Sequence, residues 1–143
     1  MGNWIKTLAG GGRFRLSDDG QSGAVEILTA SRTLTVEDSG KTFLIGTGAL
    51  VISLPATIAG ADFTFINSGA NGNNIITISP VAADGIAGTI TLASSIVTRA
   101  GTVDTDLVNT KASATVGNSV KIKGTGVTGV TAWIITSSTG IWA

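Results

Sequence analysis

The side chains that most often carry out catalysis are scarce in this sequence. It contains no His, Cys or Tyr, and its only glutamates are Glu26 and Glu37. A Ser nucleophile would therefore have to use a Lys as its base. Without His or Cys, the usual zinc, haem and copper sites cannot be built from this chain alone. We expect a protein that is not an enzyme and that has no cofactor and no metal site.

Two short motifs approach known ligand-binding loops without matching them. Asp104 and Asp106 are spaced like calcium ligands, but the Gly at the sixth position and the Glu at the twelfth position of an EF-hand loop are missing. Residues 38–42 read D-S-G-K-T, like the end of a phosphate-binding loop. However, Thr35 stands where that loop needs its first Gly, and the strand-like Phe43 follows where a helix should begin. We expect a solvated loop at the first motif and a turn into a strand at the second.

The charge balance gives no sign of a nucleic-acid or membrane partner. Nine basic and nine acidic residues leave a net charge of zero, so bulk attraction to polyanions is not expected. The N-terminus has no long apolar region of the kind found in signal peptides. Residues 42–61 and 124–143 are uncharged and approach the ~20 residues of a transmembrane helix. Gly, Thr and Ser interrupt both stretches, so we interpret them as strands.

Apolar residues alternate with polar or small residues along most of the chain. Residues 41–45, 49–54, 62–67 and 74–79 show this period of two, which is typical of strands with one buried face. Gly-, Asn- and Pro-containing turns separate them. Residues 24–36 hold one or two more strands, and 89–92, 95–98, 118–123 and 131–136 continue the pattern. With 20 Gly and 13% charged residues, the sequence predicts an all-β domain of short antiparallel strands. No strict repeat of solenoid length is visible.

Inward and outward faces follow from the same alternation. In residues 118–123 we expect Val120 and Ile122 to point inward, and Lys121 and Lys123 to point toward solvent. Trp133 is expected to be a core aromatic residue beside Ile135.

Residues 1–23 differ from the rest of the chain. They contain three consecutive glycines and three of the nine basic residues. We predict an extended N-terminal arm that orders on a partner, because Trp and Arg are enriched at binding hot spots. A frayed terminus is the other interpretation. A terminal Trp left in water would also be costly, so a subunit contact is expected there. The candidate partner-binding residues are Trp4, Ile5, Lys6, Arg13, Phe14, Arg15 and Trp142.

Several segments together form a recognisable pattern between residue 34 and the C-terminus. They are D-S-G-K-T-F at 38–43, a strand that ends in L-P at 54–55, G-A-D-F-T-F-I-N at 60–67, I-T-I-S-P at 76–80, N-S-V-K-I at 118–122, and a late strand with Trp133. This pattern resembles a module of tailed-bacteriophage virion structural proteins, which is similar to head decoration (cement) proteins and to pieces of tail fibres. The usual charged turn before the late Trp is replaced here by G-V-T-A at 129–132.

The resemblance implies a compact β-sandwich or jelly-roll, commonly assembled as a homotrimer. We therefore expect two parts, an arm at residues 1–23 and a β-sandwich domain at residues 24–143. The implied function is that of a non-enzymatic decoration protein on the outer capsid surface of the virion, made in the host cytoplasm. Its partners would be the major capsid protein and further copies of itself.

Two other functions stay open from the sequence. The first is a tail-fibre or baseplate domain that binds host surface glycans through Asn- and Gly-rich loops such as residues 68–74. The second is a β-structured hydrolase or lyase of the phage tail, which would need two convergent carboxylates in a cleft.

Overall fold

The protein is an all-β structure, as the sequence predicts. A computed structural model describes residues 24–143, apart from the side chain of Lys111. The larger sheet has seven strands in the spatial order β1 (Val25–Leu28), β3 (Thr42–Ile45), β5 (Asp62–Asn67), β10 (Ser119–Gly124), β11 (Trp133–Thr139), β7 (Ile86–Thr91) and β8 (Ile96–Arg99). The smaller sheet has four, in the order β2 (Arg32–Thr33), β4 (Leu50–Ser53), β6 (Ile76–Ser79) and β9 (Leu107–Asn109). Single turns of 3-10 helix are η1 (Val36–Asp38) and η2 (Lys111–Ser113).

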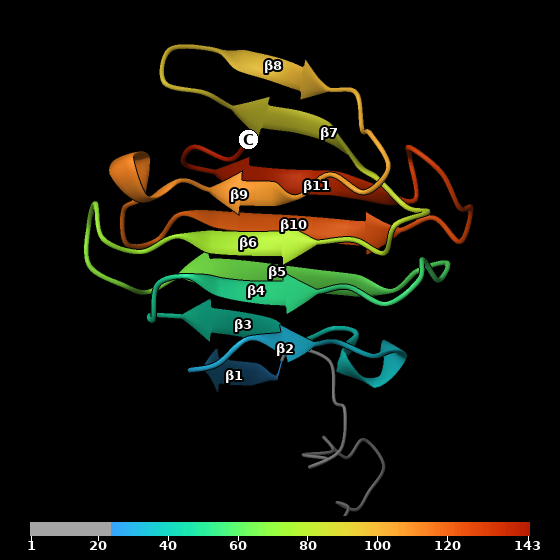
Figure 1. Cartoon of the computed structure of the whole chain (residues 1–143), viewed down its shortest axis with the longest axis horizontal. Coiled ribbons are helices and arrows are strands. Elements are labelled where there is room, and N and C mark those ends of the chain that lie inside the picture. Colours follow the sequence, from blue (N-terminus) through green and yellow to red (C-terminus); the bar gives the residue numbers. More distant parts are fainter. Residues whose placement is uncertain (1–23) are drawn as a thin grey trace, which may run out of the picture.

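The two sheets lie one over the other, and the chain crosses repeatedly between them. Figure 1 shows the smaller sheet in front of the larger one, with β7 and β8 extending beyond it. From β1 to β6, odd-numbered strands belong to the larger sheet and even-numbered strands to the smaller one. We call residues 25–79, which contain these six strands, the parallel coil, because all four strand pairings within it are parallel.

The prediction of an antiparallel fold is therefore wrong for five of the nine strand pairings, because β11 and β7 are also parallel. Antiparallel strands joined by brief connections would return within one sheet. Instead, the connection after β3 carries the chain across to the smaller sheet, with Ala49 in the left-handed region at φ 65°. Val25 on β1 is in register with Thr42 on β3, which is 17 residues further along the chain. Thr42 is in turn in register with Thr64 on β5, which is 22 residues further along. These unequal turns explain why no fixed repeat is visible in the sequence.

The hydrophobic core fills the space between the sheets, and the predicted inward faces are confirmed. Phe43 and Phe65 stack with ring centroids 5.7 Å apart, and Phe63 lies 5.6 Å from Trp133. Lys121 and Lys123 are on the solvent side, where each ammonium lies 3.7 Å from the Asp62 carboxylate. Burial of such apolar side chains contributes roughly 1.5–3 kcal/mol each, so the core is the main source of stability.

A buried asparagine network closes one end of the core. Asn67 Nδ2 donates to Asn109 Oδ1 at 2.8 Å, and Asn109 Nδ2 donates to the Ile141 carbonyl at 2.7 Å. Asn74 Nδ2 donates to Asn67 Oδ1 and to the Ile45 carbonyl, both at 2.8 Å. The network joins the two sheets where apolar side chains give way to loops. It also involves β9, a strand that is not among those predicted from the alternation of apolar and polar residues.

Within residues 24–143, no helix is long and apolar enough to span a membrane.

Candidate functional site

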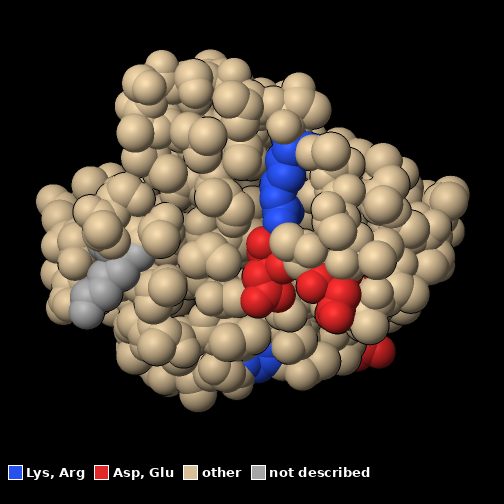
Figure 2. Space-filling view, turned by 45° about the horizontal axis from the view of Figure 1, so that its top comes forward, with Lys and Arg blue, Asp and Glu red and all other residues tan. Residues whose placement is uncertain are grey.

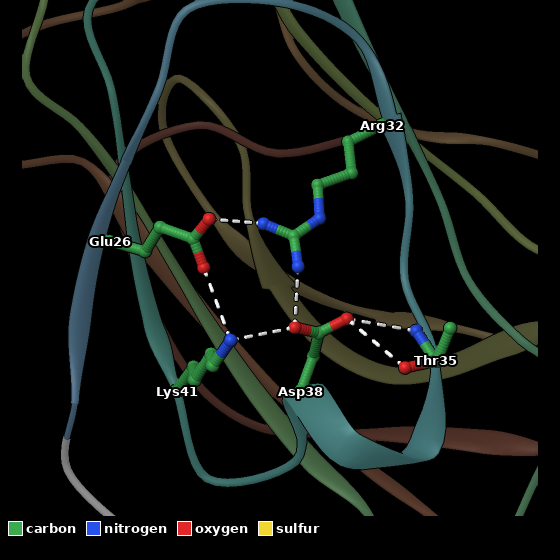
Figure 3. A network of polar contacts seen from close by, with 5 residues as sticks. All are labelled: Glu26, Arg32, Thr35, Asp38 and Lys41. Atoms are coloured by element: carbon green, nitrogen blue, oxygen red, sulfur yellow. Dashed lines mark hydrogen bonds and ion pairs between the residues drawn. The ribbon is translucent and has the colours of Figure 1, made fainter. Parts of the chain in front are cut away.

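Four charged side chains meet at the edge of the parallel coil and form the most developed polar site among the described residues (Figure 3). Arg32 on β2 binds the carboxylate of Glu26 on β1 and, at 2.6 Å, Asp38 Oδ1 at the end of η1. Lys41, just before β3, lies 2.8 Å from Asp38 Oδ1 and 3.2 Å from Glu26 Oε1. Each cation thus contacts both carboxylates, and we call this group the ion cluster.

The ion cluster occupies the last inward-facing positions of the core. Glu26 is in register with Phe43 on the next strand, and Arg32 is in register with Ile52. The Arg32 guanidinium lies 5.7 Å from the centroid of the Phe43 ring. At the edge of the coil, the carboxylate and the guanidinium therefore replace apolar side chains and face each other across the gap between the sheets.

The local sequence holds Asp38 in place through the 3-10 turn. Thr35 is the N-cap residue of η1, and its backbone N–H donates to Asp38 Oδ2 at 3.0 Å. The Thr35 hydroxyl lies 3.4 Å from the same oxygen. Asp38 Oδ2 thus accepts hydrogen bonds from the turn, while Oδ1 forms ion pairs with Arg32 and Lys41.

Burial and ionic contacts act in opposite directions on Asp38. Burial raises the pKa of the Asp38 carboxyl, but the hydrogen bonds from Lys41 and the Thr35 backbone, with the charges of Arg32 and Lys41, bring it below its ordinary value. The hydrogen bond to Asp38 raises the pKa of Lys41, and the contact with Glu26 adds to this effect. Asp38 and Lys41 are therefore both charged near neutral pH.

A hollow of about 700 Å³ opens beside the ion cluster, lined by Arg32, Thr33, Thr35, Val36, Glu37, Asp38, Ser39 and Lys41. Both of its cations are already paired with two carboxylates, so they are poorly suited to capture an anion. Within residues 24–143, no group of three His, Cys, Asp or Glu side chains is placed to hold a metal ion. The arrangement joins three segments of the chain, namely β1, β2 and the segment from Asp38 to Lys41.

The loop with Asp104 and Asp106 is exposed, in agreement with the expected solvated loop. The guanidinium of Arg99 on β8 links this loop to β7. It donates to the carbonyl of Asp106 at 2.7 Å and to the carbonyl of Ile86 at 3.0 Å. Burial lowers the pKa of the Arg99 guanidinium, and the Asp106 charge partly opposes this effect. Figure 2 shows acidic and basic side chains side by side, and most of the described residues around them on this face are uncharged.

Of the seven predicted partner-binding residues, the structure describes only Trp142, and it lies in the core rather than at the surface. The Trp142 side chain is fully buried, and its Nε1 donates to the Thr139 carbonyl at 3.1 Å. Residues 141 and 143 each bond to a different sheet, which folds the end of the chain back over the core. Its indole therefore has no surface to offer a partner. Trp4, Ile5, Lys6, Arg13, Phe14 and Arg15 lie outside the described residues.

Two asparagines of the loop at residues 68–74 form hydrogen bonds within the fold. Asn74 is buried in the asparagine network, and Asn71 Oδ1 accepts a hydrogen bond from the Val116 backbone at 2.8 Å. Asn74 is therefore engaged in the fold, whereas Asn71 is exposed and contributes only its Oδ1 to the fold.

Sequence reasoning missed the ion cluster, although one signal was present. Alternation in residues 25–28 places Glu26 on the same face as Leu28, which marks it as a charged residue at an inward position. A partner of opposite charge on a neighbouring strand was then to be expected.

Comparison with known proteins found no family model and no curated protein that matches this chain.

Proposed function

We propose that this chain is a non-enzymatic structural protein of a tailed-bacteriophage virion, a decoration protein that binds the outer capsid surface as a homo-oligomer. Its partners in this proposal are the major capsid protein and two further copies of itself. The proposal starts from the sequence pattern between residue 38 and Trp133. In the structure, the D-S-G-K part of that pattern supplies Asp38 and Lys41 of the ion cluster, and the F-T-F part supplies core aromatic residues.

We also infer that the two facing sheets constitute the β-sandwich that the resemblance implies. A jelly roll consists of antiparallel Greek keys. The parallel pairings of β1 to β6 therefore favour a sandwich that begins as a coil over a jelly roll.

The observation that carries the proposal is the outer face of the smaller sheet. Opposite the buried side chains, its strands present Thr33, Val51, Ser53, Thr77, Ser79 and Val108. These residues stand in registered rows, with Val51 beside Thr77 and Thr77 beside Val108. The face is uncharged and made of small side chains on paired strands. Such a surface suits contact with another protein over a broad area.

In this proposal the protein acts mechanically. Each copy buries its face against capsid subunits, and contacts repeated by the oligomer raise the overall avidity well above that of one site. Because the protein binds the assembled shell and not the separate capsid subunits, its binding stabilises the shell against dissociation by mass action. No bond is made or broken, so no reactive group is needed.

Cryo-electron microscopy of the purified particle that contains this chain tests the proposal. We expect density for the β domain on the outer capsid lattice, with the smaller sheet toward the shell. Density confined to the tail would overturn the decoration role and favour the tail-fibre or baseplate alternative.

A pair of variants tests the assigned face. Thr77→Arg places a charge in the middle of the smaller sheet's outer face and should abolish binding to undecorated heads. Thr64→Arg makes the same change on the outer face of β5 in the other sheet and should bind as wild type. Equal binding by both variants would show that the smaller sheet is not the contact surface.

A further inference from the structure

The first strand of the larger sheet has a free edge within the described part of the chain. β1 pairs with β3 on one side, and no strand of residues 24–143 pairs with the other side. Val25 and Ile27, the outward-facing residues of β1, are 62% and 69% exposed. Backbone groups and apolar side chains are therefore presented together, a combination that promotes pairing with a further strand.

The direction of the unpaired backbone groups follows from the parallel ladder. Thr42 N–H donates to the Ala24 carbonyl at 2.8 Å, so Ala24 directs its backbone groups toward β3. Alternate residues of a strand direct theirs to opposite sides. Glu26 and Leu28 therefore face β3, whereas Val25 and Ile27 direct their N–H and carbonyl groups to the free edge.

The usual protections of an edge strand are weak here. β1 contains no Lys and no Pro, and its one charged residue, Glu26, is held inward by Arg32 and Lys41. Charges, prolines and bulges are the devices that normally discourage pairing at an edge. The Glu26 carboxylate, the one charge of β1 that could repel an added strand, is thus paired within the ion cluster.

The chain itself supplies a segment of suitable length and composition. One turn of the parallel coil separates registered residues by 17 positions at Val25–Thr42 and by 22 at Thr42–Thr64. One turn before Val25 therefore falls between residues 3 and 8, which hold Trp4, Ile5 and Leu8. A connection of this kind is intramolecular, so its effective concentration is high.

We propose that residues 4–8 of the same chain dock as a parallel strand on the free edge of β1 and add one more turn to the coil. The apolar side chains of this segment then cover Val25 or Ile27 on one face and approach Leu28 on the other. This inference is independent of the capsid role, because it concerns the isolated protein.

Amide exchange of the full-length chain, measured residue by residue by NMR, tests the proposal. Glu26 and Leu28 serve as internal controls, because β3 protects them in any case. We expect Val25 and Ile27 to exchange at least ~10-fold more slowly than unstructured amides, independently of protein concentration. Free exchange at Val25 and Ile27 beside protected Glu26 and Leu28 would overturn the proposal.

Two variants identify the occupant of the edge. The double change Ile5→Pro and Lys6→Pro removes adjacent N–H groups, which point to opposite sides of a strand, so one ladder bond is lost in either register. The double change should abolish the exchange protection of the Val25 and Ile27 amides and leave the protection of the Glu26 and Leu28 amides unchanged. Gly2→Pro, a control outside the proposed strand, should preserve protection. Protection that grows with concentration, or that survives the double change, would assign the edge to a second copy or another segment and refute the proposal.

Discussion

At the scale of single residues, Asp38 is the centre of the ion cluster. Its side chain is only 6% exposed, and its two oxygens bind Arg32, Lys41 and Thr35. A carboxylate in this position is stable because its contacts replace the water that it has lost. The members of the cluster therefore depend on one another, because the loss of one partner leaves a buried charge without compensation.

Replacement of Asp38 by Asn should destabilise the fold. It removes the charge at constant shape and leaves Arg32 and Lys41 with only Glu26. We expect a loss of about 2 kcal/mol, since breaking a buried pair costs roughly 3–5 kcal/mol and the partly exposed cations regain some hydration. Urea unfolding measures this difference. Glu37→Gln, an exposed neighbour in the same turn, should stay within about 0.5 kcal/mol of wild type.

The same residue makes stability depend on pH in the acid range. Its pKa in the folded protein lies below the ordinary value of 3.8, so the ionised carboxylate favours the folded state at higher pH. This contribution is complete above the unfolded pKa and disappears as the pH falls through the lowered folded pKa. The stability difference between wild type and Asp38→Asn should therefore be constant near neutrality and shrink below about pH 4. A difference that persists unchanged at pH 2 would contradict this explanation.

At the scale of elements, the asparagine network links strands of both sheets. Asn109 on β9 accepts from Asn67 on β5 and donates to Asn118 and to the Ile141 carbonyl. Buried amides that lose a partner keep their full desolvation cost. The network is thus a cooperative joint between β5, β9 and the end of the chain.

Asn109→Ala should disrupt this joint. We expect a loss of about 3 kcal/mol, because several buried groups lose a partner at roughly 1–3 kcal/mol each. Thermal unfolding followed by tryptophan fluorescence reports it through the buried Trp142. Asn73→Ala makes the same change at an exposed position of the neighbouring loop and should be close to neutral. Equal effects of the two changes would exclude a special role for the network.

The inward faces of the strands could be predicted from the sequence, whereas their partners could not. Ile76 and Ile78 alternate with polar residues in any β fold, so burial followed directly from the pattern. The turn at residues 46–48 has the same Gly-rich chemistry whether the chain returns within a sheet or crosses to the other one. Parallel pairing was therefore hidden. The ion cluster was hidden too, because it needs strand neighbours that only the topology defines.

At the scale of the whole molecule, most strand contacts join segments distant in sequence. β10 pairs with β5, and β11 pairs with β7, over long intervening stretches. Such pairings require loop closure before any contact is gained, which slows folding. We expect refolding from urea in milliseconds to seconds, measured by stopped-flow tryptophan fluorescence. Complete refolding within microseconds would contradict this expectation.

The parallel coil also determines how the protein would respond to force. A pull on the chain at residue 24 loads β1 across its ladder, so its bonds to β3 would open one after another, as in a zipper. The first obstacle to this peeling is the ion cluster, which ties β1 to β2 and to the segment before β3. A pull at the C-terminal end instead loads both sheets together, because Ile141 bridges to Thr91 and Ala143 bonds to Val108. The N-terminal end of the domain should therefore open at a lower force than the C-terminal end. The four charges of the ion cluster provide the main resistance to opening at the N-terminal end.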